Sequence, residues 1–145
     1  MSFISIENLT TRYNTSKGLV HALEDVTFAI DKGESIGIAG ESACGKSTLG
    51  LSIIQMISNG KIYSGKIQFD GKSLLDVPDD EFNKTIRWKE ISMVFQGAMN
   101  SLDPVFSIQQ QFEEVLKQHN FEGDSKQSIL QSLNSVNLDE SVLKK

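Results

Sequence analysis

The chain is poor in the features that would place it outside the cell or inside a membrane. Its 145 residues include one cysteine, Cys44, so no internal disulfide can form, and this fits a reducing compartment. No apolar run approaches the roughly 20 residues that a membrane-spanning helix requires. The first ten residues, MSFISIENLT, lack the basic and apolar regions of a signal peptide. We therefore expect no direct insertion into a membrane.

Positive charge is also scarce. The 14 lysine and arginine residues are outnumbered by 19 aspartate and glutamate residues, which leaves a net charge of −5. A broad nucleic-acid interface needs a basic face, so we expect no nucleic-acid partner. A small anion site is still compatible with this charge, because backbone N–H groups and one lysine are enough to build it.

The apolar pattern predicts an α/β protein. Alternation of apolar and polar residues predicts strands at 3–9, 26–30 and 62–69, and short apolar runs at 35–39 and 91–95 are typical of buried strands. The polar stretches 11–18 and 97–106 are expected to be loops.

Helical spacing of apolar residues appears once early and more strongly late in the chain. Helices are predicted at 49–57 and 78–86. Two more are expected to begin at Ser107, which has a capping-box partner in Gln110, and at Asp124. We therefore expect an α/β core followed by the beginning of a helical subdomain.

Residues 40–48, GESACGKST, match G-x-x-x-x-G-K-[ST], the pattern of a phosphate-binding P-loop. They follow an apolar run and open a predicted helix, which is the context that this chemistry requires. Gly40 and Gly45 permit backbone angles that other residues resist, so the N–H groups of the loop can point inward at a polyphosphate. The N-terminus of the helix adds positive potential at the same point.

Three side chains of the motif have specific predicted roles. Lys46 is expected on the β- and γ-phosphates, Ser47 on Mg²⁺ and Thr48 on the α-phosphate. The complete set of nucleotide-binding residues predicted from the motif is Gly40, Glu41, Ser42, Ala43, Cys44, Gly45, Lys46, Ser47 and Thr48. Two simpler alternatives stay open. The motif could be a glycine turn before an ordinary helix, and Cys44 could be a small turn residue instead of a thiol activated by its neighbours.

Outside the P-loop, three further features resemble the ATP-binding subunits of ABC transporters. Tyr13 lies where an aromatic residue of that family stacks on adenine, and Val20 resembles the apolar residue that flanks the base. Gln96, at the end of ISMVFQ, is similar to the Q-loop glutamine, which assists Mg²⁺ and the attacking water. Residues 99–108, MNSLDPVFSI, resemble the branch that imports dipeptides, oligopeptides and nickel.

The chain departs from that branch at two places. Gly97-Ala98 replaces the usual acidic residue and proline after the glutamine, and Asp103 stands where asparagine is more common. Neither the signature motif nor the acidic pair that holds Mg²⁺ and polarises water is recognisable. Leu138-Asp139-Glu140 does not qualify as that pair, because the residues before it are mostly polar and predict no buried strand.

The resemblance implies an incomplete P-loop NTPase core with an N-terminal antiparallel β subdomain. Residues 1–100 would form the nucleotide-binding core, and residues 101–145 would begin a helical subdomain truncated before the signature motif. The implied ligands are ATP and Mg²⁺. The implied partners are a second ATPase subunit and membrane permeases contacted through residues 97–106, which places the protein in the cytoplasm on the inner face of the cell membrane.

The resemblance also sets the expected activity. The full-length protein would be an ATPase that energises solute transport, with peptides as the expected solute. This chain would bind nucleotide but hydrolyse it poorly, because the catalytic base is absent. The alternative is a free-standing, non-hydrolytic nucleotide-binding module. A small P-loop kinase and an ATPase of DNA maintenance fit less well, since they leave Tyr13, Gln96 and the acidic charge unexplained.

Overall fold

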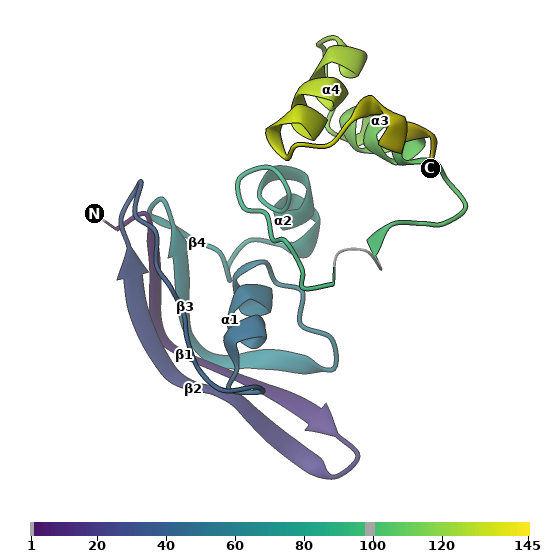
Figure 1. The fold of residues 1–145 in the computed structure, drawn as a ribbon. Coiled ribbons are helices and arrows are strands. Elements are labelled where there is room, and N and C mark those ends of the chain that lie inside the picture. Colours follow the sequence, from purple (N-terminus) through teal and green to yellow (C-terminus); the bar gives the residue numbers. More distant parts are fainter. Residues whose placement is uncertain (1, 98–100) are drawn as a thin grey trace. The chain divides into compact units, whose positions relative to one another are not determined.

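The structure is a computed structural model, and it describes residues 2–97 and 101–145 (Figure 1). The chain separates into two compact units, Met1–Met93 and Val94–Lys145. Within the described residues, no helix is both long and apolar enough to cross a bilayer.

An antiparallel sheet of four strands, in the order β2-β1-β3-β4, forms the frame of the first unit. The strands are β1 (Ile4–Thr15), β2 (Gly18–Ile30), β3 (Gly60–Phe69) and the short β4 (Lys72–Ser73). Figure 1 shows β1 and β2 running side by side as a long ribbon, and they pair from Ile4 with Ile30 to Thr15 with Gly18. Because β1 also pairs with β3, it is the central strand for most of its length.

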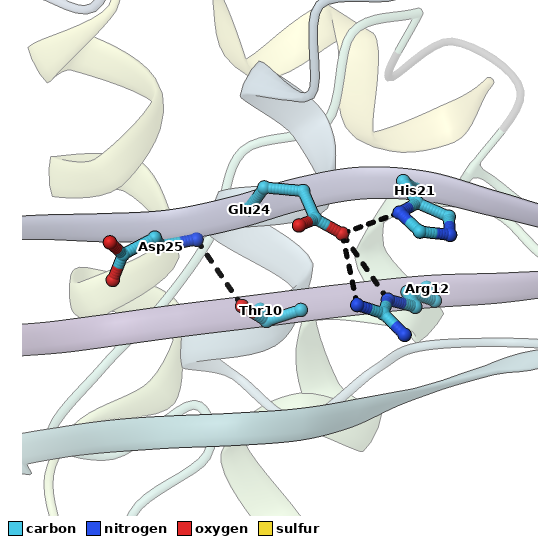
Figure 2. Close-up of polar contacts among 5 residues, drawn as sticks. All are labelled: Thr10, Arg12, His21, Glu24 and Asp25. Atoms are coloured by element: carbon cyan, nitrogen blue, oxygen red, sulfur yellow. Dashed lines mark hydrogen bonds and ion pairs between the residues drawn. The ribbon is translucent and has the colours of Figure 1, made fainter.

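Register shifts interrupt β1 where it passes between its two neighbours. The backbone N–H of Asp25 donates to the Thr10 hydroxyl at 3.2 Å, as Figure 2 shows, so a side chain takes up a donor near the irregular segment. On the same two strands, Oε1 of Glu24 accepts from Nε of Arg12 at 3.2 Å and lies 2.6 Å from Nδ1 of His21. The contacts made by Thr10 and Arg12 of β1 tie this strand to β2 where the regular ladder is broken.

Apolar residues of the sheet and two helices form the core of the first unit. Helix α1 (Lys46–Ile53) contributes Leu49, and helix α2 (Asp79–Thr85) contributes Phe82, which is fully buried. The other buried apolar residues of this core are Ile6, Leu9, Leu23, Ile67, Phe69, Leu74 and Ile86. A buried hydrogen bond of 3.1 Å between the hydroxyls of Thr11 and Ser52 also joins β1 to α1.

The second unit is helical. Helices α3 (Ile108–Gln118) and α4 (Ser125–Ser135) and the 3₁₀ helix η2 (Glu140–Lys144) enclose a small core of Ile129, Leu133 and Leu143. Both predicted caps are confirmed. Ser107 and Gln110 form the capping box of α3, and the Asp124 carboxylate accepts from the N–H of Gln127 at 3.0 Å.

The prediction of a loop at 11–18 was wrong. Residues up to Thr15 continue β1, and β2 begins at Gly18, so only a tight turn separates the strands. The polar composition of this hairpin hid its strand character, because the pairing is supplied by β2 and β3 and depends little on burial. The predicted strands at 3–9, 26–30 and 62–69 are confirmed within the longer observed strands, except that Phe3 precedes the start of β1.

The predicted strands at 35–39 and 91–95 are not formed. Residues 35–39 have no regular structure, and Ile36 and Ile38 are 41% and 51% exposed. Ile91 makes only an isolated bridge to Arg87. A strand needs neighbours that accept and donate its backbone hydrogen bonds, and the described residues supply none for these two segments beyond that bridge.

Helix α1 is also shorter than predicted. It ends at Ile53 instead of 57, and Gln55 has a positive φ of 52° that turns the chain away from the helical path. Ile54 and Gln55 accept hydrogen bonds from the Arg87 guanidinium, so the end of α1 is held by a side chain from a distant segment.

Candidate functional site: the P-loop pocket

The loop before α1 has the backbone curvature expected of a phosphate cradle. Ala43 and Gly45 both have positive φ values, 63° and 95°, and α1 begins at the next residue, Lys46. A Cβ atom at Gly45 would lie 2.4 Å from the carbonyl oxygen of Ala22. Glycine is therefore required at position 45 both by its backbone angle and by its contact with β2.

Lys46 folds back over this loop. Its ammonium group donates to the carbonyl oxygens of Gly40 at 2.8 Å and Glu41 at 2.6 Å, and to Sγ of Cys44 at 3.2 Å. These contacts hold a positive charge at the mouth of the loop, although the region remains largely exposed. A bound polyphosphate would offer the ammonium stronger, charged acceptors than two carbonyls and a thiol.

A pocket of ≈ 300 Å³ opens between the loop and the β1–β2 hairpin. Tyr13 of β1 and Val20 of β2 form one wall, and the start of α1 forms another. The Tyr13 hydroxyl donates to Oγ1 of Thr48 at 3.4 Å, so the two walls touch. The complete lining is Tyr13, Val20, His21, Ala22, Ala43, Cys44, Gly45, Lys46, Ser47 and Thr48.

Most of the residues predicted from the sequence therefore meet in one place. Tyr13 and Val20 are distant in sequence from the P-loop; strand pairing sets them opposite each other, and both line the pocket together with the loop. The other predicted binding residues, Gly40, Glu41 and Ser42, belong to the same exposed loop without lining the pocket. Their roles stay predictions.

Gln96 is an exposed residue of the second unit, whereas every residue that lines the pocket belongs to the first. Its role in Mg²⁺ and water positioning thus stays a prediction.

In the described part of the chain, no group of three histidine, cysteine or acidic side chains could hold a metal ion. Ser47 contributes one hydroxyl to the pocket, which is the type of ligand that P-loops offer to a nucleotide-bound Mg²⁺.

The thiol of Cys44 is exposed, and the hydrogen bond from Lys46 lowers its pKa below the usual value. The same ammonium that would face phosphate therefore also stabilises a thiolate.

Asp139 belongs to the segment Leu138-Asp139-Glu140, which does not qualify as the acidic pair of an ABC ATPase. Its carboxylate has a structural role. Asp139 caps η2 by accepting from the N–H of Ser141 at 2.8 Å, and this hydrogen bond lowers the pKa of its carboxyl.

Two lining residues were missed from the sequence. His21 and Ala22 follow Val20 directly in β2, so their adjacency to a predicted base-flanking residue was an available signal. Half of the His21 side chain is exposed, and Glu24 lies against its Nδ1 atom.

Comparison with known proteins agrees with this geometry. The ABC transporter family matches residues 23–145, and the chain belongs to that family. It is 39% identical over 117 residues to the oligopeptide transport ATP-binding protein OppD of Haemophilus influenzae, covering 80% of this chain and 36% of OppD. It is also 39% identical over 118 residues to the dipeptide transport ATP-binding protein DppD of Lactococcus lactis, covering 81% of this chain and 34% of DppD.

The fold is likewise that of an ATP-binding cassette. The structure superposes with a TM-score of 0.79 and 25% identity on the cassette MJ0796, solved as a dimer bound to ADP and Pi, over 97% of this chain and 60% of that one. The chain spans about a third of the length of the two curated relatives.

Proposed function

We propose that this chain binds Mg²⁺-ATP in the P-loop pocket, as the nucleotide-binding part of an ATPase that energises peptide transport. The observation that carries this proposal is the pocket itself, in which the Tyr13 ring and the P-loop face one space of ≈ 300 Å³. The names of the relatives, which are oligopeptide and dipeptide transport proteins, support peptides as the transported solute.

The chemistry follows from what each part of the pocket offers. Tyr13 and Val20 present an aromatic face and an apolar side chain suited to a base. The N–H groups at the start of α1, with Lys46, suit the phosphates, and the Ser47 hydroxyl suits Mg²⁺. ATP-driven phosphoryl transfer to water is mainly a matter of positioning and charge stabilisation, and Gln96 is proposed to assist it.

Hydrolysis by this chain alone is proposed to be weak. The family resemblance implies a carboxylate as the general base, and no carboxylate of the described residues lines the P-loop pocket. Residues 1–100 are proposed to form the nucleotide-binding core and residues 101–145 the start of the helical subdomain. Residues 98–100 of the proposed permease-contacting segment, 97–106, lie outside the described residues.

The proposed assembly places the protein at the inner face of the cell membrane. There it would bind a second ATPase subunit and membrane permeases, without inserting into the bilayer. The relatives support this arrangement as ATP-binding components of transport systems.

Calorimetric titration of the chain with Mg²⁺-ATP tests the proposal. Lys46→Ala removes the lysine of the pocket lining and should weaken binding at least about tenfold, or roughly 1.4 kcal/mol. The matched control is Lys66→Ala, which removes an exposed lysine of β3 that lies 3.8 Å from Glu7. Equal ATP affinity in the wild type and Lys46→Ala, or no binding by the wild type, would contradict the proposal.

A further inference from the structure

We propose that Gly60 is a positioning residue for nucleotide recognition, because its missing side chain leaves the space in which the Tyr13 ring lies. The inference rests on the proposed function and concerns the base subsite of the same pocket. In the structure Gly60 opens β3, seven residues beyond the end of α1 at Ile53, and pairs with Tyr13 of β1.

The strand register places Gly60 directly opposite Tyr13. Tyr13 of β1 pairs with Val20 of β2 on one side and with Gly60 of β3 on the other. Directly opposed residues of an antiparallel pair project on the same face of the sheet. Of the two neighbours of Tyr13 across the strands, one therefore has a side chain and the other has none.

Among the cross-strand neighbours Val20, Tyr13 and Gly60, the Tyr13 ring lies on the side of Gly60. A Cβ atom at position 60 would lie 2.7 Å from Cδ1 of Tyr13, well inside van der Waals contact. It would also lie 2.9 Å from Cγ2 of Ile57, so the ring and Ile57 together close the space above the glycine. An aromatic ring that covers a cross-strand glycine is a known way of stabilising such a position in a sheet.

The far end of the ring is held by α1. The Tyr13 hydroxyl donates to Oγ1 of Thr48 at 3.4 Å. The edge of the ring thus lies against Gly60 while its hydroxyl meets the first turn of the P-loop helix. Val20, which is 48% exposed, remains accessible on the other side. The ring is therefore held at the wall of the pocket instead of lying across it toward Val20.

A methyl group at position 60 has a specific expected consequence. It would push the ring away from β3 and toward Val20, into the space proposed for the base. The phosphate subsite is built from the P-loop and would keep its shape. Substitution of Gly60 should consequently weaken recognition of the base without weakening recognition of phosphate.

The test compares Mg²⁺-ATP with Mg²⁺-tripolyphosphate, which has the phosphates but no base. We expect Gly60→Ala to lower ATP affinity about tenfold, a loss typical of one base–aromatic stack, with tripolyphosphate affinity unchanged. The matched control is Gly123→Ala in the second unit, where the added Cβ would lie 2.5 Å from the Phe121 ring. This control crowds a ring in the same way outside the pocket lining and should leave both affinities unchanged.

A double-mutant cycle decides whether Gly60 acts through Tyr13. In a Tyr13→Ala background, Gly60→Ala should have no further effect on ATP affinity, because there is no ring left to displace. Equal losses for ATP and tripolyphosphate, or additive effects in the cycle, would overturn the inference. If the wild type binds tripolyphosphate and ATP with equal affinity, the base is not recognised and the inference also fails. If the wild type binds neither ligand, the proposed function itself is refuted.

The added methyl group would also lie 2.7 Å from the carbonyl oxygen of Arg12, so Gly60→Ala could fail to fold. A measurement on the wild type covers this case. Proton NMR of the ATP-bound chain should show nuclear Overhauser contacts from the Tyr13 ring to the Gly60 α-protons and to the adenine protons. Absence of the contact to Gly60 in a chain that shows the contact to adenine would overturn the inference.

Discussion

The two segments that border the P-loop differ in how well the rest of the molecule supports them. Helix α1, which follows the loop, is joined to the sheet by the buried Thr11–Ser52 hydrogen bond and by Leu49. Residues 35–39, which precede the loop, are exposed and unpaired. Both contain apolar residues, so the presence of apolar side chains does not by itself explain the difference. The difference is that α1 satisfies its own backbone hydrogen bonds, whereas a strand depends on neighbours.

Core truncation should show this difference most strongly. Phe82→Ala in α2 should destabilise the first unit by about 3–5 kcal/mol, because Phe82 is fully buried and leaves a cavity. Ile38→Ala in the unsupported segment should cost less than about 0.5 kcal/mol, as is usual for exposed sites. Urea denaturation of the two variants measures both values. Similar losses would show that residues 35–39 are packed in solution and do not differ from α1 in their support.

A smaller effect is expected at the C-terminus of α1. Arg87→Met removes the guanidinium that donates to the carbonyl oxygens of Ile54 and Gln55, each at 2.9 Å. Loss of hydrogen bonds from a charged donor should destabilise the first unit by about 2 kcal/mol. Lys89→Met removes a nearby exposed charge and serves as the control. A thermal melt in which both variants match the wild type would show that α1 does not depend on this contact.

The smallest effect concerns the loop between the two segments. Because Lys46 lowers the pKa of Cys44, the thiolate should be present at lower pH than in a free cysteine. The rate of iodoacetamide alkylation should therefore rise at lower pH in the wild type than in Lys46→Met, in which the profile should move back to higher pH. If the two profiles coincide, the Lys46–Cys44 contact is absent in solution. Mg²⁺-ATP should slow alkylation by occupying the pocket.

Local signals in the sequence predicted much of the fold. The capping box of Ser107 and Gln110, the Asp124 cap and the alternation at 3–9, 26–30 and 62–69 are all present as predicted. Each depends on residues within a few positions, so sequence spacing is enough to find it. The length of the β1–β2 hairpin was underestimated, because its polar outer part is held by cross-strand pairing with little burial.

The residues of the candidate site also fall into two groups, those that sequence spacing reveals and those that strand pairing brings together. The P-loop was recognisable because its chemistry needs consecutive residues, two glycines followed by lysine and hydroxyls. The contributions of His21 and Ala22 to the pocket, and the space that Gly60 leaves for Tyr13, depend on which strands pair and in what register. The spacing of residues along the chain does not directly predict that register.

The sequence by itself thus determined the P-loop motif, the helix caps and the alternating strands, since each is specified by neighbouring residues. Only the tertiary structure decided that Tyr13 would lie beside Thr48 and over Gly60, because pairing of β1 with β3 and packing of α1 on β1 bring these three residues together. It also decided that 35–39 and 91–95 would not be strands, since the described residues supply no partner strands for their backbone groups.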